Sequence, residues 1–145
     1  MAISIYTTLI SKINNTLDTV NEIKQRFNYP ASKISKYPCV IVFPDNFENE
    51  FETINENIKI YRFKMYLIID LLEGLEEEIW TIRMPALVDA VLAQFDADWD
   101  SGNIDGHRVW FNIDNGSWEN AKYDKGVEAI AELNLYIKLL TTNNS

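Results

Sequence analysis

The stretch that decides the fold begins with Tyr37-Pro38-Cys39-Val40-Ile41-Val42-Phe43-Pro44 and ends with Asn57-Ile58-Lys59-Ile60-Tyr61-Arg62-Phe63-Lys64-Met65-Tyr66-Leu67-Ile68-Ile69-Asp70. Residues 39–43 form a short apolar run that is typical of a buried strand. In the second segment, every second residue from Tyr61 to Ile69 is apolar or aromatic, as on one face of a strand. Pro44 predicts a bulge or an edge position. The stretch therefore predicts one long β-hairpin.

The register of this hairpin follows from its turn. We expect the turn at Asn55-Glu56-Asn57. A three-residue loop there sets the cross-strand neighbours as Phe51 with Tyr61, Phe47 with Met65, Glu50 with Arg62, and Glu48 with Lys64. Each exposed charge pair contributes less than about 1 kcal/mol, so the apolar contacts must decide the register. The polar tip, residues 49–60, is expected to extend beyond the subunit.

Two helices flank the hairpin in sequence. Residues 3–27 carry apolar side chains at helical spacing, and Asn28-Tyr29-Pro30 predicts the end of that helix. Glu76, Glu77 and Glu78 suit the positive end of a second helix dipole. Pro85 lies inside the following apolar stripe, so we expect an entry turn and then a main helix with Pro85 in its first turn.

The C-terminal third predicts a second hairpin. Residues 96–106 are polar and turn-rich, and residues 108–113 alternate as a strand. Asn115-Gly116 is a strong turn signal, after which residues 118–123 continue the strand or return. Residues 129–140 are the clearest strand, with Leu135 and Ile137 on its apolar face. Residues 141–145 are expected to be a flexible tail.

The order of helix, hairpin, helix and hairpin predicts an α+β fold. We expect a mainly antiparallel sheet of about four strands, with the helices packed on one face. The 145 residues are enough for one domain, residues 1–145, and Val91, Leu92, Leu135 and Ile137 are expected in its core.

Composition excludes several classes of protein. The formal net charge of -9 disfavours a specific nucleic-acid binder, because phosphate binding needs a basic surface. The N-terminus carries no secretion signal, and no apolar segment is long enough to span a bilayer, so we expect a cytoplasmic site of synthesis and no membrane partner. Cys39 is the single cysteine, which rules out an internal disulfide.

No group of residues predicts catalysis, and we expect no enzyme, no cofactor and no bound metal. The acidic segment 96–102 resembles a calcium loop, but neither possible frame has the required glycine and glutamate. His107 is the single histidine, and nothing in the sequence activates it or Cys39. The glycines are scattered in turns and form no phosphate-binding loop.

Exposed aromatic residues indicate contact surfaces instead. Trp99 and Trp118 lie in expected loops, where aromatic side chains often mark protein interfaces. The candidate interface residues are Phe47, Glu48, Glu50, Phe51, Ile54, Tyr61, Arg62, Trp99 and Trp118.

Five segments resemble the tail terminator, or tail completion, proteins of long-tailed bacteriophages. They are Ile5-Tyr6-Thr7-Thr8-Leu9-Ile10, Tyr37-Pro38-Cys39-Val40-Ile41-Val42, the returning strand 61–69, Leu87-Val88-Asp89-Ala90-Val91-Leu92, and Glu132-Leu133-Asn134-Leu135-Tyr136-Ile137. The resemblance covers nearly the whole chain in length and element order. Residues 102–126 carry no family signature.

The resemblance implies a structural virion protein of the phage tail, assembled in the host cytoplasm. Such proteins form a homomeric ring, usually a hexamer, that caps the tail tube protein, stops its polymerisation and offers a surface to the head-tail connector protein. DNA passes through the lumen without specific binding. The alternatives are another head-tail joining or tail-tube protein, or a small α+β module that binds a ligand or peptide.

Overall fold

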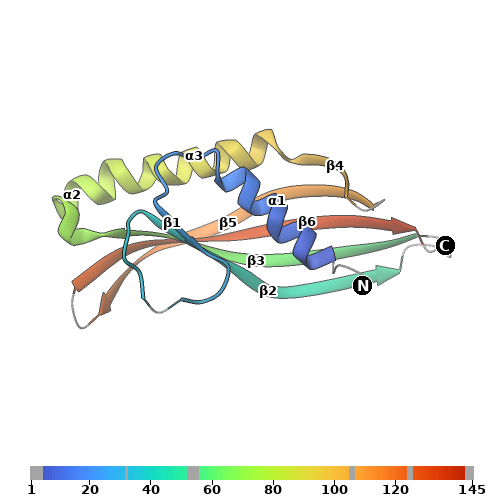
Figure 1. Ribbon diagram of the computed structural model, residues 1–145, viewed down its shortest axis with the longest axis horizontal. Coiled ribbons are helices and arrows are strands. Elements are labelled where there is room, and N and C mark those ends of the chain that lie inside the picture. Colours follow the sequence, from blue (N-terminus) through green and yellow to red (C-terminus); the bar gives the residue numbers. More distant parts are fainter. Residues whose placement is uncertain (1–4, 32, 52–55, 105–106, 124–125, 143–145) are drawn as a thin grey trace.

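The computed structural model describes residues 5–31, 33–51, 56–104, 107–123 and 126–142 (Figure 1). The chain forms α1 (Ile5–Leu17), β1 (Gln25–Phe27), β2 (Cys39–Phe51), β3 (Glu56–Asp70), the 3-10 turn η1 (Leu71–Glu73), α2 (Glu76–Glu78), the π-helical turn η2 (Ile79–Arg83), α3 (Met84–Ala97), β4 (Asp100–Ile104), β5 (His107–Tyr123) and β6 (Gly126–Thr142). The predicted α+β class is confirmed.

The strands form one sheet in the order β1-β2-β3-β6-β5-β4. The prediction of about four strands is wrong, because the described residues form a sheet of six. It is also mixed, since β1 runs parallel to β2 while the other strand pairs are antiparallel. The two additional strands, β1 and β4, are short and lie at the two sides of the sheet.

The main core lies between one face of the sheet and the helices. The alternating residues of β3 and β6 predicted to share a face do so, and their side chains belong to one cluster with residues of α1 and α3. Val91, Leu135 and Ile137 are fully buried, as predicted. Leu92 is only partly buried.

A second, smaller apolar cluster lies on the opposite face of the sheet. It consists of Cys39, Ile41, Ile68 and Ile130, with side chains of β1 and the segment after it packed against them. Tyr37 donates a hydrogen bond to Glu128 across this cluster. The segment between β1 and β2 is thereby held to the central strand β6.

The first hairpin has a different register from the predicted one. Phe47 lies opposite Tyr61, and Phe51 lies opposite Asn57. Glu56 and Asn57 already belong to β3, so the turn is not at the expected three residues. The predicted bulge is confirmed, because the register shifts between Pro44 and Asn46. The chain reverses nearer to Phe51 than predicted, and this displaces all the predicted pairs between Phe47 and Phe51; the bulge changes the register only at Pro44 and before it.

The first hairpin does not project from the sheet by itself, because β6 runs alongside it. Strand β6 pairs with β3 as far as Glu56 and Thr142, so the inner side of the hairpin is covered along its length. Strand β6 therefore includes the first two residues of the segment expected to be a tail. Residues 143–145 lie outside the described residues.

The first helix is much shorter than predicted, because α1 ends at Leu17. Thr19 donates through Oγ1 to the carbonyl oxygen of Thr16 at 2.6 Å, and the Val20 amide donates to the Leu17 carbonyl oxygen at 3.0 Å. Asparagine, aspartate and threonine side chains compete for backbone hydrogen bonds in this way and so terminate helices. The apolar residues that follow belong to a turn and to β1.

The second helical region confirms the interpretation of Pro85. The three glutamates form the first turn, α2, and Pro85 lies at the start of α3. The π-helical turn η2 joins them, which accommodates a residue that has no backbone N–H to donate. None of the helices formed by the described residues is long and apolar enough to span a membrane.

The predicted turn at Asn115-Gly116 is wrong. Strand β5 continues through both residues to Tyr123, with a register shift between Ile113 and Asn115. A Cβ atom on Gly116 would lie 2.5 Å from the carbonyl oxygen of Glu132. The glycine thus permits a close approach of two strands rather than a reversal of the chain.

Candidate interaction surfaces

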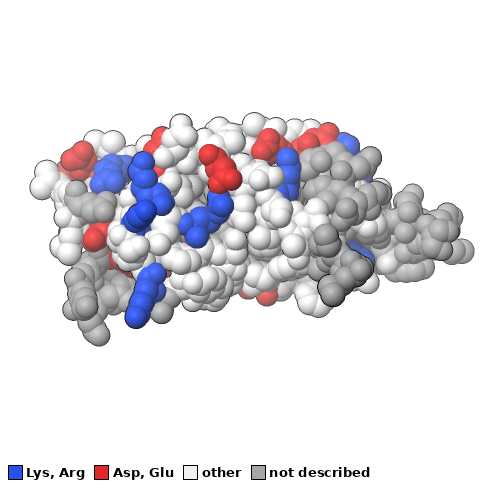
Figure 2. Space-filling view, viewed as in Figure 1, with Lys and Arg blue, Asp and Glu red and all other residues white. Residues whose placement is uncertain are grey.

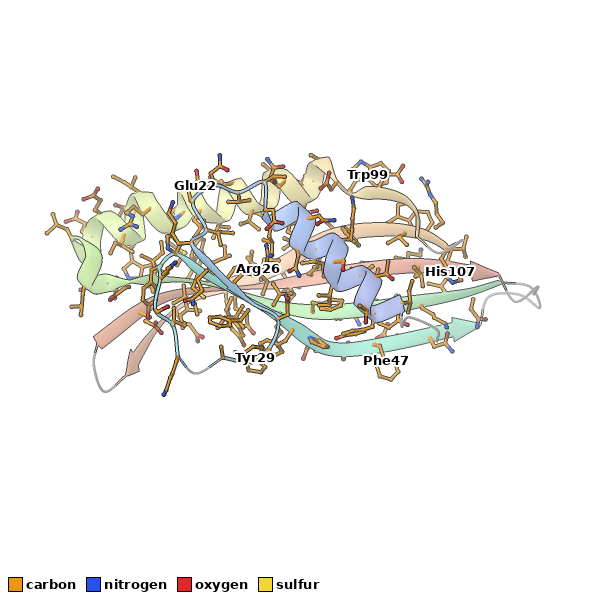
Figure 3. All side chains as sticks on the ribbon, in the orientation of Figure 1. Glu22, Arg26, Tyr29, Phe47, Trp99 and His107 are labelled. Atoms are coloured by element: carbon orange, nitrogen blue, oxygen red, sulfur yellow. The ribbon has the colours of Figure 1, made fainter. Side chains whose placement is uncertain are left out.

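The residues that could support catalysis are not assembled. Cys39 is completely buried, and burial raises the pKa of its thiol to about 11. His107 begins β5, near the opposite side of the sheet from Cys39 in β2 (Figure 3). Over the described ranges, no three His, Cys, Asp or Glu side chains form a group that could hold a metal ion.

Two strand edges lack a partner over much of their length. Strand β1 pairs with β2 only at Cys39–Ile41, and β4 pairs with β5 only as far as Trp110. No described strand pairs with the outer edges of β2 over 42–51 or of β5 over 112–123. These edges lie on opposite sides of the sheet, and each presents backbone donors and acceptors to a further strand.

Phe47 is the most exposed of the described aromatic side chains on the β2 edge. Its side chain is 74% exposed, and its ring lies beyond the outer edge of β2 in Figure 3. Tyr61, directly opposite, packs instead against the Tyr6 ring of α1, with the ring centroids 6.1 Å apart. Phe47 is thus a candidate contact residue, whereas Tyr61 supports the fold.

The charged candidates of this hairpin have other partners than predicted. Glu48 forms an ion pair with Arg62 at 3.1 Å, not with Lys64. Lys64 instead pairs with Glu132 at 2.7 Å. The side chains of Glu50 and Phe51 and the whole of Ile54 lie outside the described residues, so their predicted contacts are not tested.

Trp99 lies where α3 passes into β4. Its side chain is 54% exposed, and its carbonyl oxygen accepts a hydrogen bond from the Phe111 amide at 2.8 Å. It borders a hollow of about 480 Å³ that also contains Trp110 and Lys138. The cationic groups of Arg108 and Lys138 lie 5.4 and 5.9 Å from the Trp110 ring centre. We call Arg108, Trp110 and Lys138 the cationic cluster.

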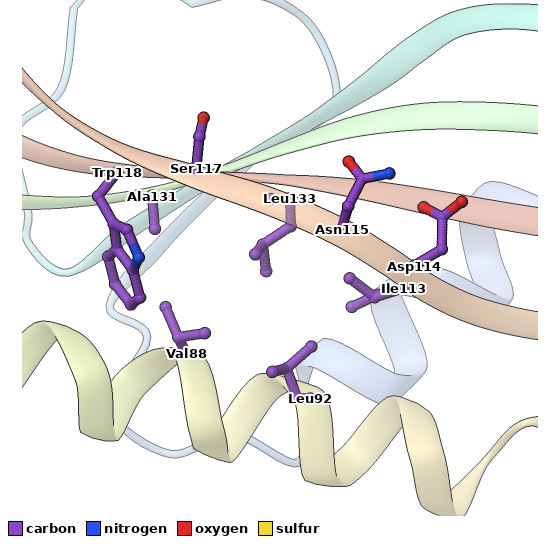
Figure 4. A pocket seen from close by; sticks show the side chains of 10 residues that line it. Val88, Leu92, Ile113, Asp114, Asn115, Ser117, Trp118, Ala131 and Leu133 are labelled. Carbon is purple, nitrogen blue, oxygen red and sulfur yellow. The ribbon is translucent and has the colours of Figure 1, made fainter.

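Trp118 belongs to the second edge rather than to a loop. Its side chain is 54% exposed and borders an apolar hollow of about 220 Å³ between β5 and α3. In Figure 4, Trp118 points from β5 toward the helix, and Val88 and Leu92 point from α3 toward the strand. The remaining side chains around the hollow include Ile113, Ala131 and Leu133. One large apolar group of a partner could enter it.

A further exposed apolar surface, which was not predicted from the sequence, lies around α2, away from the hollow beside Trp118. Leu72, Leu75 and Ile82 are 74%, 73% and 61% exposed around the turn that contains the three glutamates. The sequence did contain an indication of this surface, because these three apolar residues fall outside the apolar stripe that predicts the second helix. Exposed apolar residues grouped in this way indicate a contact surface.

Charge is unevenly distributed over the surface. Four basic residues, Lys24, Arg26, Lys33 and Lys36, are exposed, and residues 23–44 contain no acidic residue. Figure 2 shows basic side chains on the half of this face that carries β1 and the segment after it. Residues 45–56, in contrast, contain five acidic residues and no basic residue. Basic and acidic residues are thus separated along the sequence between positions 23 and 56.

Comparison with known proteins does not place the chain in a family. No protein-family model and no curated protein matches its sequence.

Proposed function

We propose that this protein is a structural component of a bacteriophage tail that assembles into a closed homomeric ring, most simply a hexamer. The ring caps the tail tube, stops its polymerisation and offers the surface to which the head-tail connector binds. The protein acts in the virion, is assembled in the host cytoplasm, and has no enzymatic activity. The tail assignment derives from the sequence resemblance described above.

The observation that carries the ring proposal is the pair of unpaired strand edges on opposite sides of one sheet. A closed ring requires two different surfaces on each subunit, one of which contacts the other surface of the next subunit. The edges of β2 and β5 meet this requirement, because they are distinct and face away from each other. A symmetric dimer would use one such edge twice and leave the second unpaired.

The charge of the protein is compatible with a channel for DNA. At a formal net charge of -9, repulsion limits adhesion of the phosphate backbone to the ring. DNA in this proposal passes through the lumen and is not bound specifically.

The decisive experiment adds the purified protein to polymerising tube subunits of the same phage and examines the tubes by electron microscopy. The proposal expects shorter tubes with a ring of this protein at one end. Tubes that keep growing, with neither end occupied, would refute the terminator function. In that case, another joining protein or a peptide-binding module would explain the exposed tryptophans better.

A further inference from the structure

We infer that the subunits join by strand addition: the outer edge of β2 from one copy pairs with the outer edge of β5 in the next, and Phe47 of the first copy enters the hollow beneath Trp118 of the second. This inference rests on the proposed ring, because it names the contact through which the ring closes. The occupant of the hollow is therefore a second copy of this chain.

Strand direction favours this pairing. The neighbours β2 and β3, β3 and β6, and β6 and β5 are all antiparallel, so β2 and β5 of one copy run in opposite directions. When copies follow one another in the same orientation, β2 of one copy therefore runs antiparallel to β5 of the next. The sheet continues across the contact with regular antiparallel hydrogen bonding.

Phe47 and Trp118 also lie on the same face of the sheet. Phe47 lies opposite Tyr61, which packs against α1, so Phe47 is on the face of the sheet that carries the helices. Trp118 lies opposite the buried Ala131, which belongs to the same face. In a sheet that continues from one copy to the next, Phe47 thus arrives on the side where the hollow lies.

The hollow has a suitable size and lining for an aromatic ring. Its volume is about 220 Å³, and Val88, Leu92 and Trp118 provide apolar walls. An apolar cavity of about 150 Å³ is already large enough to take up benzene. Phe47 is 74% exposed in its own subunit, so its transfer into the hollow removes a large apolar surface from water.

The two short strands leave the required segments accessible. Strand β1 covers β2 before residue 42, and β4 covers β5 before residue 112. The accessible part of β2 is the half that ends at the hairpin tip, and the accessible part of β5 is the half that ends at Tyr123. Pairing of these halves staggers adjacent copies, and a stagger is required when a sheet closes on itself.

The contact is tested by disulfide trapping in the full chain with Phe47→Cys and Leu92→Cys combined. Trapping accumulates a covalent product even when association is weak, so a protein that is mostly monomeric in solution still gives an answer. The control combines Phe47→Cys with Leu72→Cys, because Leu72 is as exposed as Phe47 but lies away from the hollow. Mass spectrometry of the oxidised products identifies which positions are joined.

We expect intermolecular 47–92 links in a ladder of oligomers, at a yield several-fold above the control pair. A 47–92 yield no higher than the control yield would overturn the inference. If the wild-type protein still caps tubes in that case, the ring stands and only its contact is wrong; if links form but tubes are not capped, the contact stands and the terminator function fails.

Discussion

Replacing Leu135 with alanine should destabilise the protein strongly. Leu135 is fully buried at the centre of β6, between Phe63 of β3 and Ile113 of β5. Strands on both sides hold the backbone in place, so the cavity cannot collapse easily. Substitutions of this kind cost about 2.7–5 kcal/mol of unfolding free energy. For a chain of this length, roughly 3 °C is lost per kcal/mol, which predicts a melting temperature lower by about 8–15 °C.

Urea unfolding followed by circular dichroism measures this change as a shift of the transition midpoint. Leu72→Ala is the matched control, since it removes the same atoms from a side chain that is 74% exposed. That variant should stay within about 0.5 kcal/mol of the wild type. Equal shifts for the two variants would mean that β6 does not direct Leu135 into the core, and the assignment of the two sheet faces would then be wrong.

Three further predictions concern single sites. Gly116→Ala should cost about 1–3 kcal/mol in the same urea assay, because the new Cβ would meet the Glu132 carbonyl oxygen at 2.5 Å; Ser117→Ala, its neighbour, should change stability far less. Burial raises the pKa of the Cys39 thiol to about 11. At pH 8, Cys39 should therefore be alkylated roughly a hundredfold more slowly in the folded protein than in the urea-unfolded protein. Equal alkylation rates would contradict its burial. The hydrogen bond from Lys64 is the main cause that lowers the pKa of Glu132. The ionised Glu132 carboxylate therefore stabilises the fold at pH values above its ordinary pKa of about 4.3. This stabilisation is lost as the pH falls through the lower pKa of the folded state. Glu132→Gln should therefore weaken the acid dependence of unfolding, and an unchanged pH profile would contradict the pair.

Alternation of apolar residues allowed the centre of the sheet to be predicted. Tyr61 to Ile69 and residues 129–140 form adjacent central strands, and their inward side chains are those that the sequence indicated. A buried strand constrains every second residue, so its pattern is visible without knowledge of its neighbours.

The sides of the sheet could not be predicted because their strands are specified by partners distant in sequence. Residues 100–104 are polar except for Ile104 and form β4 only by pairing with the start of β5. Asn115-Gly116 carries a turn signal, yet the long strand β6 lies alongside and supplies hydrogen bonds for a continuous strand. Residues 25–27 continue a helical apolar pattern but pair with β2 instead. In each case, tertiary contacts override the local preference.

The exposure of three candidate contact residues could be predicted from the sequence. Phe47, Trp99 and Trp118 are exposed, as expected for contact residues. Their surroundings could not be derived, because the hollow beneath Trp118 depends on how far α3 stands from β5. The register error moved the expected partners of the hairpin charges, and no single strand contains the information that would correct it.

The small strand β1 has a consequence for the kinetics of assembly. It pairs with β2 only through Gln25–Phe27, over the minor apolar cluster, and so short a strand opens locally at a lower free-energy cost than the whole sheet. Its amide protons should exchange with solvent sooner than those of β3 and β6. Each opening of β1 exposes the β2 edge at residues 39–41. In the proposed ring, the length of edge available to an incoming subunit would therefore change with local unfolding. The rate of subunit addition would then depend on temperature, and on denaturant at concentrations far below those that unfold the sheet.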